Sequence, residues 1–300
     1  MAGSFPGSHT NQLSQLTQEQ HDAFWRDGYL LVEDAVSPAL LTRLRDQFSR
    51  WVEVSRTHDQ PWDETINGLP RFHLEAAHRP DKPCLQRVNA PVEVSAAYFE
   101  AMSDSPMTAM VADLIGPDVK FHHSKINSKL PGGNTAVKWH QDFPFTPHSN
   151  DDLITALLMV DEVTLENGPL DVLPASHTGP IHSLWHEGRF TGSVEASVAE
   201  QSQRDSVRCT GPAGTVCLMH TRLLHGSAPN LSTRPRTLFI SVYSAEDAIK
   251  QSPNPMPNRY EGLIVAGRKT NRVRSLAYDI ELPQLPSTGS FFDQQAKPSG

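Results

Sequence analysis

The sequence centres on the stretch Ala136-Val137-Lys138-Trp139-His140-Gln141-Asp142-Phe143-Pro144-Phe145. On an extended segment, side chains two residues apart project from the same side of the backbone, so the His140 imidazole and the Asp142 carboxylate can converge on one point. This arrangement suits one edge of a metal site that takes two ring nitrogens and one carboxylate and leaves positions open for oxygen and a co-substrate. A His-x-Asp motif also occurs in ordinary surface turns, so its meaning depends on the residues that follow downstream.

The composition is that of a globular protein with a sizeable core: 300 residues, 38% hydrophobic and 20% charged. A net charge of −8 without a basic run argues against nucleic acid and against an anionic membrane surface as partners. Three scattered cysteines without a CxxC motif predict neither a disulfide framework nor a cysteine zinc site, and they favour a reducing, cytoplasmic location. The polar segment 1–16 does not resemble a signal peptide, and no apolar run reaches the length of a membrane span.

The first part of the chain is predicted to be helical, with helices over residues 17–26, 37–51 and 95–114. Thr17 and Gln20 form a capping box at the start of the first helix, and Asp27-Gly28 ends it. The stretch 52–85 is rich in proline, histidine and charged residues, so we expect a loop that could cover a pocket.

From residue 119 the pattern changes to short strands separated by turns such as 131–134 and Asn167-Gly168. Strands are expected at 29–32, 119–129, 136–139, 153–160, 169–173, 214–219 and 236–243. The polar stretch 178–210 is predicted to be an insertion with a short helix. Helices followed by many short strands indicate an α+β fold whose core is an antiparallel double-stranded β-helix, the cupin-like jelly roll. We expect one domain over 17–286, lid loops near 52–85 and 178–210, a disordered tail at 1–16 and a polar tail at 287–300.

A second metal-like cluster follows the strand at 214–219 and contains His220 and His225, and Arg236 comes eleven residues after the latter. Two histidines and one carboxylate form the facial triad that suits Fe(II). An arginine can hold a carboxylate with two parallel hydrogen bonds. A dicarboxylate co-substrate could therefore chelate iron with its keto acid end and meet the arginine at its other end. From these residues alone, His220 rivals His225 and Arg234 rivals Arg236.

Together, these motifs resemble the phytanoyl-CoA dioxygenase family of Fe(II)/2-oxoglutarate-dependent oxygenases. The resemblance extends from about Thr17 to about Ala245. It is carried, in order, by Asp27-Gly28-Tyr29, His140-Gln141-Asp142, Thr164-Leu165-Glu166-Asn167-Gly168-Pro169-Leu170, Pro174-Ala175-Ser176-His177 and His225-Gly226-Ser227-Ala228-Pro229-Asn230-Leu231-Ser232 with Arg236.

The resemblance implies that the iron ligands, and so the catalytic centre, are His140, Asp142 and His225. It implies that Arg236 binds the far carboxylate of 2-oxoglutarate with help from Ser227. His225 is preferred to His220 because a Gly-Ser-x-x-Asn run follows it, and Arg234 precedes a proline and is expected in the loop. Related halogenases carry a small residue where this chain has an aspartate, so the intact carboxylate favours hydroxylation.

Other site residues are predicted with a structural alternative beside each. Lys125 matches a position that lines the co-substrate pocket, or it is a solvated lysine on a strand. Lys138, Phe143 and Phe145 are the candidates for contacting substrate. An exposed position is the alternative for the lysine, and core packing is the alternative for the two phenylalanines. His177 is expected to hold a loop rather than a metal.

The implied function is a non-haem Fe(II)- and 2-oxoglutarate-dependent dioxygenase. It would use O2 to hydroxylate a small polar or amphipathic metabolite, releasing succinate and CO2. Two alternatives remain: the same site could catalyse desaturation, cyclisation or demethylation in natural-product metabolism, or the chain could be a non-catalytic jelly-roll protein that binds a metal or a small acid. The oligomeric state, monomer or homodimer, is left open.

Overall fold

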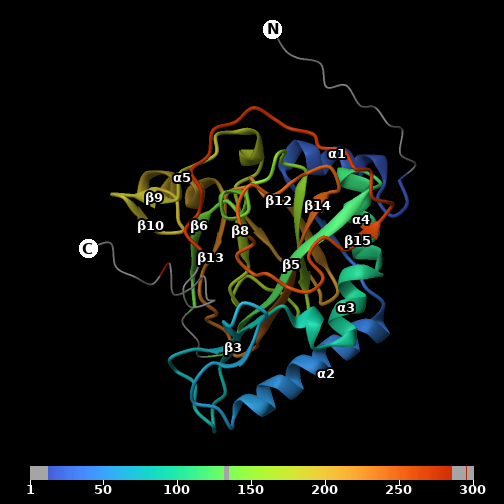
Figure 1. Cartoon of the computed structure of the whole chain (residues 1–300). Coiled ribbons are helices and arrows are strands. Elements are labelled where there is room, and N and C mark those ends of the chain that lie inside the picture. The colour runs from blue at the N-terminus through green and yellow to red at the C-terminus, as the bar shows by residue number, and fades with distance from the viewer. Residues whose placement is uncertain (1–12, 132–134, 286–294, 296–300) are drawn as a thin grey trace.

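Two antiparallel sheets face each other and form a jelly roll, with helices packed on the outside of the larger sheet (Figure 1). The computed structural model describes residues 13–131, 135–285 and residue 295. In the larger sheet the strand order is β1-β12-β7-β14-β5-β4-β3-β2, and β15 also pairs with β5. These strands are β1 (Tyr29–Val32), β2 (Trp62–Glu64), β3 (Pro70–Leu74), β4 (Leu85–Asn89), β5 (Val119–Lys129), β7 (Leu153–Met159), β12 (Val216–His220), β14 (Arg236–Ala245) and β15 (Ile264–Ala266).

The smaller sheet has the order β11-β8-β13-β6 and supplies the other wall of the jelly roll. Its strands are β6 (Val137–His140), β8 (Leu170–Val172), β11 (Val207–Cys209) and β13 (His225–Ser227). A separate hairpin of β9 (Trp185–His186) and β10 (Arg189–Phe190) lies with helix α5 (Ala196–Asp205) at one side of the molecule (Figure 1). The predicted insertion at 178–210 is therefore folded, and it contains the short helix that the sequence indicated.

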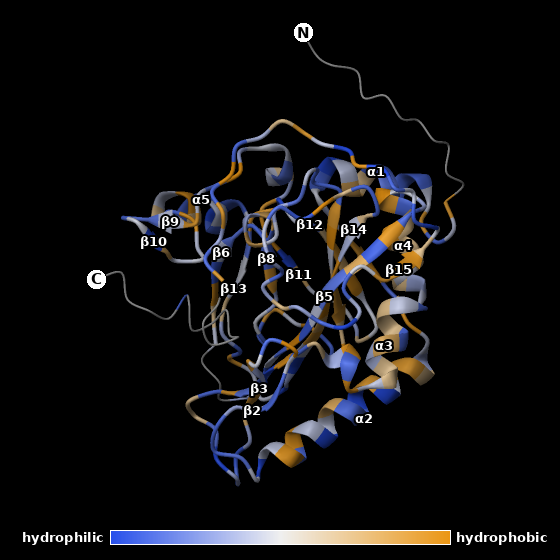
Figure 2. Cartoon of the chain, viewed as in Figure 1, coloured by the Kyte–Doolittle hydropathy of each residue, from blue (hydrophilic) through white to orange (hydrophobic). Residues whose placement is uncertain are grey.

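Four helices precede the main strands: α1 (Gln18–Asp27), α2 (Pro38–Ser55), α3 (Ala96–Ser103) and α4 (Pro106–Ile115). The capping box predicted at Thr17 and Gln20 is present, and Gly28 ends α1 with a φ of 80°. In Figure 2 helices α3 and α4 are largely hydrophobic, as expected for helices that cover the sheet. Short 3-10 turns lie at Pro91–Glu93, Phe143–Phe145 and Ser176–Thr178.

Strand β7 shows how the core is divided between the two faces of the larger sheet. All seven of its residues are buried. Ile154, Ala156 and Leu158 belong to the core shared with the helices, whereas Leu157 and Met159 belong to the core between the sheets. This alternation follows from the two-residue period of a strand. The inward face of the same sheet is therefore the place where a site inside the jelly roll has to be built.

The fold class is confirmed, and some element boundaries differ from the predictions. The helix expected over 95–114 is two helices, because Ser105 is extended before Pro106, which restricts the residue ahead of it and lacks an N–H of its own. The loop expected at 52–85 contains the end of α2 and strands β2 and β3. At the start of the chain, the backbone amide of Leu16 donates to Asp113, which holds this residue against α4. The remaining tail prediction, the turn at 132–134 and most of the stretch 287–300 lie outside the described residues.

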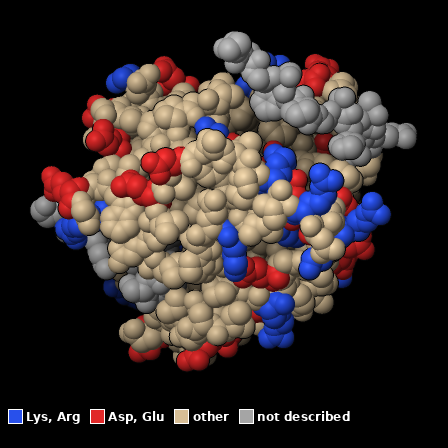
Figure 3. Space-filling view, turned by 45° about the horizontal axis from the view of Figure 1, so that its top comes forward, with Lys and Arg blue, Asp and Glu red and all other residues tan. Residues whose placement is uncertain are grey.

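Acidic and basic side chains are interspersed on the face shown in Figure 3. No helix among the described residues has the length and apolar character needed to cross a bilayer.

Candidate metal centre and co-substrate pocket

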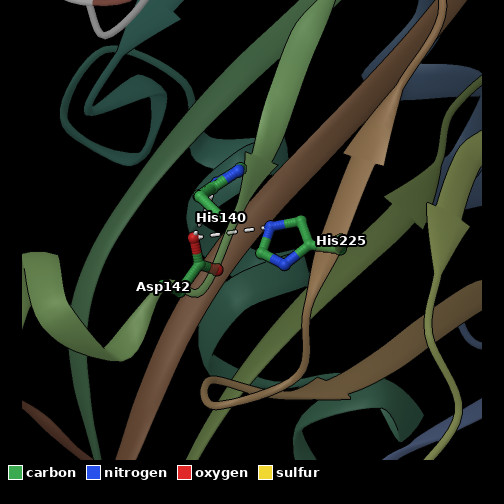
Figure 4. Close-up of side chains that lie close together, drawn as sticks. All are labelled: His140, Asp142 and His225. Atoms are coloured by element: carbon green, nitrogen blue, oxygen red, sulfur yellow. Dashed lines mark ion pairs between the residues drawn. The ribbon is translucent and has the colours of Figure 1, made fainter. Parts of the chain in front are cut away.

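Two histidines far apart in the sequence become cross-strand neighbours in the smaller sheet. His140 ends β6 and His225 begins β13, and the two residues are paired in the antiparallel register. Their ring centroids are 4.1 Å apart. The Nε2 atoms of His140 and His225 lie 3.5 and 3.7 Å from Oδ1 of Asp142. Figure 4 shows the three side chains pointing toward one another between the sheets.

The hydrogen bonds of the two rings decide which nitrogen faces the cluster. Nδ1 of His140 lies 2.8 Å from the carbonyl of Lys138, and Nδ1 of His225 lies 2.9 Å from the carbonyl of Leu223. A carbonyl only accepts, so each Nδ1 carries the proton and each Nε2 presents a lone pair. Two lone pairs and a carboxylate within 4.8 Å of one another are three acceptors without a donor between them. Such a donor set fits a divalent cation such as Fe(II).

Asp142 is placed by the 3-10 turn that follows β6 rather than by the strand itself. Its backbone is helical, with φ −73° and ψ −31°, and it caps the turn at Phe143–Phe145. Its Oδ2 accepts a hydrogen bond of 2.7 Å from the hydroxyl of Thr155 on β7. Burial raises the pKa of Asp142, but the nearby rings of His225 and His140 outweigh burial and hold this pKa below its usual range. The carboxylate is therefore charged and its second oxygen is fixed, as a metal ligand requires.

A cavity of about 50 Å³ leads from the cluster to a pair of buried cations. Arg236 begins β14, and Lys129 is its cross-strand partner at the end of β5. The Lys129 ammonium donates to Oγ of Ser227 at 2.7 Å and to the carbonyl of Ala228. Nε of Arg236 donates to the carbonyl of Gly168 at 3.0 Å.

Burial is the main cause of the pKa shifts of both cations. It lowers the pKa of Lys129 to about 6, with Arg236 adding to the shift, and it lowers the pKa of Arg236 to about 10. Among the described residues that line this cavity, Asp142 at its metal end is the only acid. A dicarboxylate fits this asymmetry, with one end at the metal and the other between Lys129 and Arg236.

The comparison with known proteins agrees with this arrangement. The sequence profile of phytanoyl-CoA dioxygenase (PhyH) matches residues 24–238. The chain belongs to the phytanoyl-CoA dioxygenase family. A probable alpha-ketoglutarate-dependent hypophosphite dioxygenase of Stutzerimonas stutzeri is 31% identical over 273 residues, covering 88% of this chain and 91% of that protein. The L-proline trans-4-hydroxylase of Streptomyces griseoviridis is 26% identical over 241 residues, covering 74% of this chain and 84% of that protein.

Solved structures of similar fold include EctD from S. alaskensis in its apo form, with a TM-score of 0.63, 23% identity and coverage of 92% of this chain and 91% of that one. The carbocyclase SnoK from nogalamycin biosynthesis has a TM-score of 0.60 and 20% identity, covering 78% of this chain and 85% of that one. The chain is thus an Fe(II)- and 2-oxoglutarate-dependent dioxygenase that uses O2, with a jelly-roll fold.

The structure places the two alternative residues, His220 and Arg234, away from the cluster and its cavity. His220 is buried away from the cluster, where its Nδ1 accepts from the backbone of Arg222. Arg234 lies at the surface and forms an ion pair with Glu162 at 2.6 Å. His177 contacts the carbonyl of Trp25 at 3.2 Å, in keeping with the expected structural role.

Of the four weaker candidates, two lie at the cluster and two do not. Lys125 and Phe145 line the cavity at the cluster, and the Phe145 ring meets the His140 ring edge-on at 5.8 Å. Phe143 is fully buried in a small core with Leu153 and does not line that cavity. Lys138 is exposed and donates to the carbonyl of Gln295, which agrees with the alternative of an exposed position.

Two polar residues of the site were missed from the sequence. Lys129 lies four residues after Lys125 and therefore on the same face of β5, so strand alternation starting from Lys125, which the resemblance had selected, could have pointed to Lys129 as well. Thr155 lies in an otherwise apolar strand, and nothing in its neighbourhood distinguishes it from a core threonine. The predicted lids at 52–85 and 178–210 contribute no residue to the two cavities at the cluster. The wall there comes instead from residues 255–256 and 283–285.

Proposed function

We propose that His140, Asp142 and His225 hold Fe(II), and that Lys129, Ser227 and Arg236 hold the far carboxylate of 2-oxoglutarate. The observation that carries this proposal is the alignment of three acceptor groups and two buried cations along one cavity. A protein that only binds a metal or a small acid does not need a metal site and an anion site in one cavity. A 2-oxoglutarate-dependent oxygenase does, because it has to place its co-substrate against its metal.

When bound, iron and 2-oxoglutarate supply the activation of O2, with 2-oxoglutarate oxidised to succinate and CO2 and one oxygen atom transferred to the substrate. The chain supplies position and exclusion of water. Arg236 and Lys129 fix the far end of the co-substrate, so that its keto acid end meets the histidines. Thr155 fixes the Asp142 carboxylate, and the Phe145 ring packs against the ring of His140.

Iron content and succinate release test these roles together. His140→Ala and His225→Ala are expected to lose iron and all 2-oxoglutarate-dependent succinate release, because each removes one of three ligands. The control is His21→Ala, which alters a histidine on the outside of α1. Iron would be measured by elemental analysis after anaerobic loading, and succinate by mass spectrometry. Full iron occupancy and turnover in both ligand variants would contradict the assignment.

We propose hydroxylation as the outcome, because the carboxylate ligand Asp142 is intact. The mass of the product separates hydroxylation from desaturation, cyclisation and demethylation. By their names, the two relatives described above act on hypophosphite and on L-proline. We propose a small polar metabolite for this chain, and hypophosphite and L-proline are the first compounds to test.

We propose that the protein works in a reducing compartment such as the cytoplasm. Cys84, Cys209 and Cys217 are free and buried, and the sulfur atoms of the latter two lie 4.0 Å apart without a bond.

A further inference from the structure

A second cavity lies at the metal cluster and is distinct from the path to Arg236. It encloses about 60 Å³ and shares His140, Asp142 and Lys125 with the co-substrate cavity. A compound bound here would lie against the metal ligands while 2-oxoglutarate occupies the other cavity. It is therefore the place for the substrate, if the metal site is the one proposed above. The part of its wall that can move then decides how the substrate enters.

Most of the wall of this substrate cavity is fixed. The strands β4, β5, β6 and β14 supply Arg87, His123, Lys125, His140 and Val242. Met256 lies outside the strands, but its amide donates to Oδ1 of Asn254 at 2.9 Å and its carbonyl accepts from Nδ2 of Asn258 at 3.3 Å. Both asparagines are buried and donate to the carbonyl of His122 on β5. This side of the cavity cannot move without breaking buried hydrogen bonds, which are costly to leave unmade.

The remaining wall segment, residues 283–285, is held far less firmly. It belongs to a stretch without helix or strand that crosses the molecule from the side of α4 and β15 to that of α5 and β9 (Figure 1). Between residues 277 and 283, no backbone amide donates a hydrogen bond to a residue that the structure describes. The side chains of Leu282 and Leu285 are 57% and 44% exposed. Segments with so few buried contacts open most readily.

The stretch is well attached where it begins. Arg274 forms ion pairs with Asp152 and Asp247, the latter at 3.1 Å. The Tyr278 ring then packs edge-on against the buried ring of Phe143, with 5.4 Å between the ring centroids. Movement of the wall therefore has to start after Tyr278.

The end of the stretch is held by two hydrogen bonds from the insertion at 178–210. Nε1 of Trp185 donates to the carbonyl of Leu282 at 3.1 Å, and the hydroxyl of Ser183 donates to the carboxylate of Glu281. The indole ring itself is placed by the ring of Phe190, at 5.3 Å. Both hydrogen bonds lie at the surface, where water can replace either partner at little cost. They act on the two residues directly before the segment that closes the cavity.

We propose that residues 281–285 form a lid over the substrate cavity, that Trp185 and Ser183 latch this lid, and that Leu285 contacts the substrate. The proposal rests on the metal site proposed above. It gives the insertion a role in substrate entry although none of its residues lines the cavity. Opening needs only the two surface hydrogen bonds to break, whereas every other part of the wall is held by strands or by buried hydrogen bonds.

The first test measures how fast iron leaves through the substrate cavity. The enzyme is loaded anaerobically with Fe(II) and 2-oxoglutarate, and 2,2′-bipyridine traps the iron that escapes, which is followed by absorbance. Trp185→Phe keeps the ring contact with Phe190 and removes the N–H donor, and Ser183→Ala removes the hydroxyl. The double variant is expected to release iron about fivefold faster or more. Its equilibrium affinity for Fe(II) should stay the same, because a lid changes entry and exit equally.

The double variant Trp62→Phe with Ser206→Ala is the matched control, since neither residue lines either cavity. An unchanged release rate in the iron-loaded latch variant overturns the lid and leaves the metal site intact. Faster release with an equally weakened affinity for Fe(II) overturns it too, because the substitutions would then have damaged the metal site. Failure of the unaltered chain to take up iron refutes the metal site, and the lid with it.

The second test places a bulky group on the lid itself. Cys84, Cys209 and Cys217 are buried, so Leu285→Cys introduces an accessible thiol that N-ethylmaleimide labels. The cavity holds roughly five water-sized groups, and the adduct is larger than that, so the lid should stay open and iron release should rise. Val273→Cys, at a position 60% exposed and ahead of the attached part, is the control. Equal release before and after labelling of Leu285→Cys, or an equal rise at both positions, would show that Leu285 does not close the cavity.

Discussion

Replacement of Lys129 by methionine tests the proposed co-substrate pocket, because this lysine should take up a proton when 2-oxoglutarate binds. Burial and the adjacent Arg236 guanidinium lower the pKa of Lys129 to about 6, and Asp171 and Glu75 act in the opposite direction without reversing the shift. At pH 7.5 the ammonium form would then be present in about one molecule in thirty, because the pH lies about 1.5 units above the pKa. A dianionic co-substrate stabilises the charged form. Binding of 2-oxoglutarate should therefore raise this pKa and take up close to one proton.

The sign and size of the pH dependence follow from this uptake. Affinity for 2-oxoglutarate is expected to fall by up to tenfold for each pH unit above about 6, until the pKa of Lys129 in the complex is reached. Lys129→Met should abolish this slope. At pH 6 it should also bind 2-oxoglutarate about 10- to 100-fold more weakly, because one charge-assisted hydrogen bond contributes about 1.5–3 kcal/mol.

Calorimetry on the anaerobic Fe(II)-loaded enzyme, in two buffers with different heats of ionisation, counts the protons directly. Lys269→Met, at an exposed position, is the matched control and should behave as the unaltered chain does. An uptake near zero in the unaltered chain, or an equal uptake in Lys129→Met, would refute the reasoning.

Three further perturbations test the surroundings of the site. Thr155→Val removes the hydroxyl bonded to Asp142 and should weaken Fe(II) binding about 10- to 100-fold in a metal titration, with unchanged thermal stability; unchanged affinity would exclude a positioning role. Gly28→Ala places a Cβ at a positive φ and against the ring of His177, so denaturant unfolding should show a loss of about 1–3 kcal/mol, and equal stability would mean that the ring moves aside. Burial lowers the pKa of His148 to about 4, so this group lowers the free energy of unfolding by about 1.4 kcal/mol per pH unit as the pH falls from about 6.5 to 4. Unfolding free energies of the metal-free protein, measured by urea titration at several pH values, should depend less on pH over this range in His148→Asn.

The elements that follow from local chemistry were predictable from the sequence. The capping box at Thr17 and the glycine at position 28 fix the ends of α1 with short-range interactions alone. Strand β7 was recognised from its mostly apolar run, which is typical of a strand that is buried on both faces. The break between α3 and α4 was missed, although Pro106 marks it, because the apolar pattern continues through the break.

The sequence singled out His140, Asp142 and His225 as a set, and the structure brings them together, but for a reason that differs in part from strand alternation. His140 ends a strand, whereas Asp142 lies in the first turn of a 3-10 helix, so the two side chains meet through a bend of the chain and not through strand alternation. The resemblance to the family carried the assignment where the geometric argument was incomplete. Lys138 lies two residues before His140 and was a candidate for contacting substrate, but it lies at the surface.

Residues whose role depends on tertiary packing could not be predicted. Arg87 lies on β4, just after the predicted loop at 52–85 and outside every strand that the sequence predicted, so nothing in its local sequence distinguished it from a solvated arginine. Leu285 follows β15 by almost twenty residues and reaches the metal cluster only because the C-terminal part of the chain returns across the jelly roll (Figure 1). Such long-range contacts leave no local periodicity to detect.

The co-substrate cavity explains why the inward face of β5 is cationic at a place where a jelly roll would ordinarily be apolar. Lys125 and Lys129 lie on this strand and Arg236 begins the neighbouring β14, whereas Asp142 is the only acid among the described residues that line the cavity. A dianion bound between Lys129 and Arg236 would offset the charge of these two side chains, and its other end would reach the proposed metal. The charge that the chain places along this cavity is therefore the physical reason for expecting a dicarboxylate co-substrate.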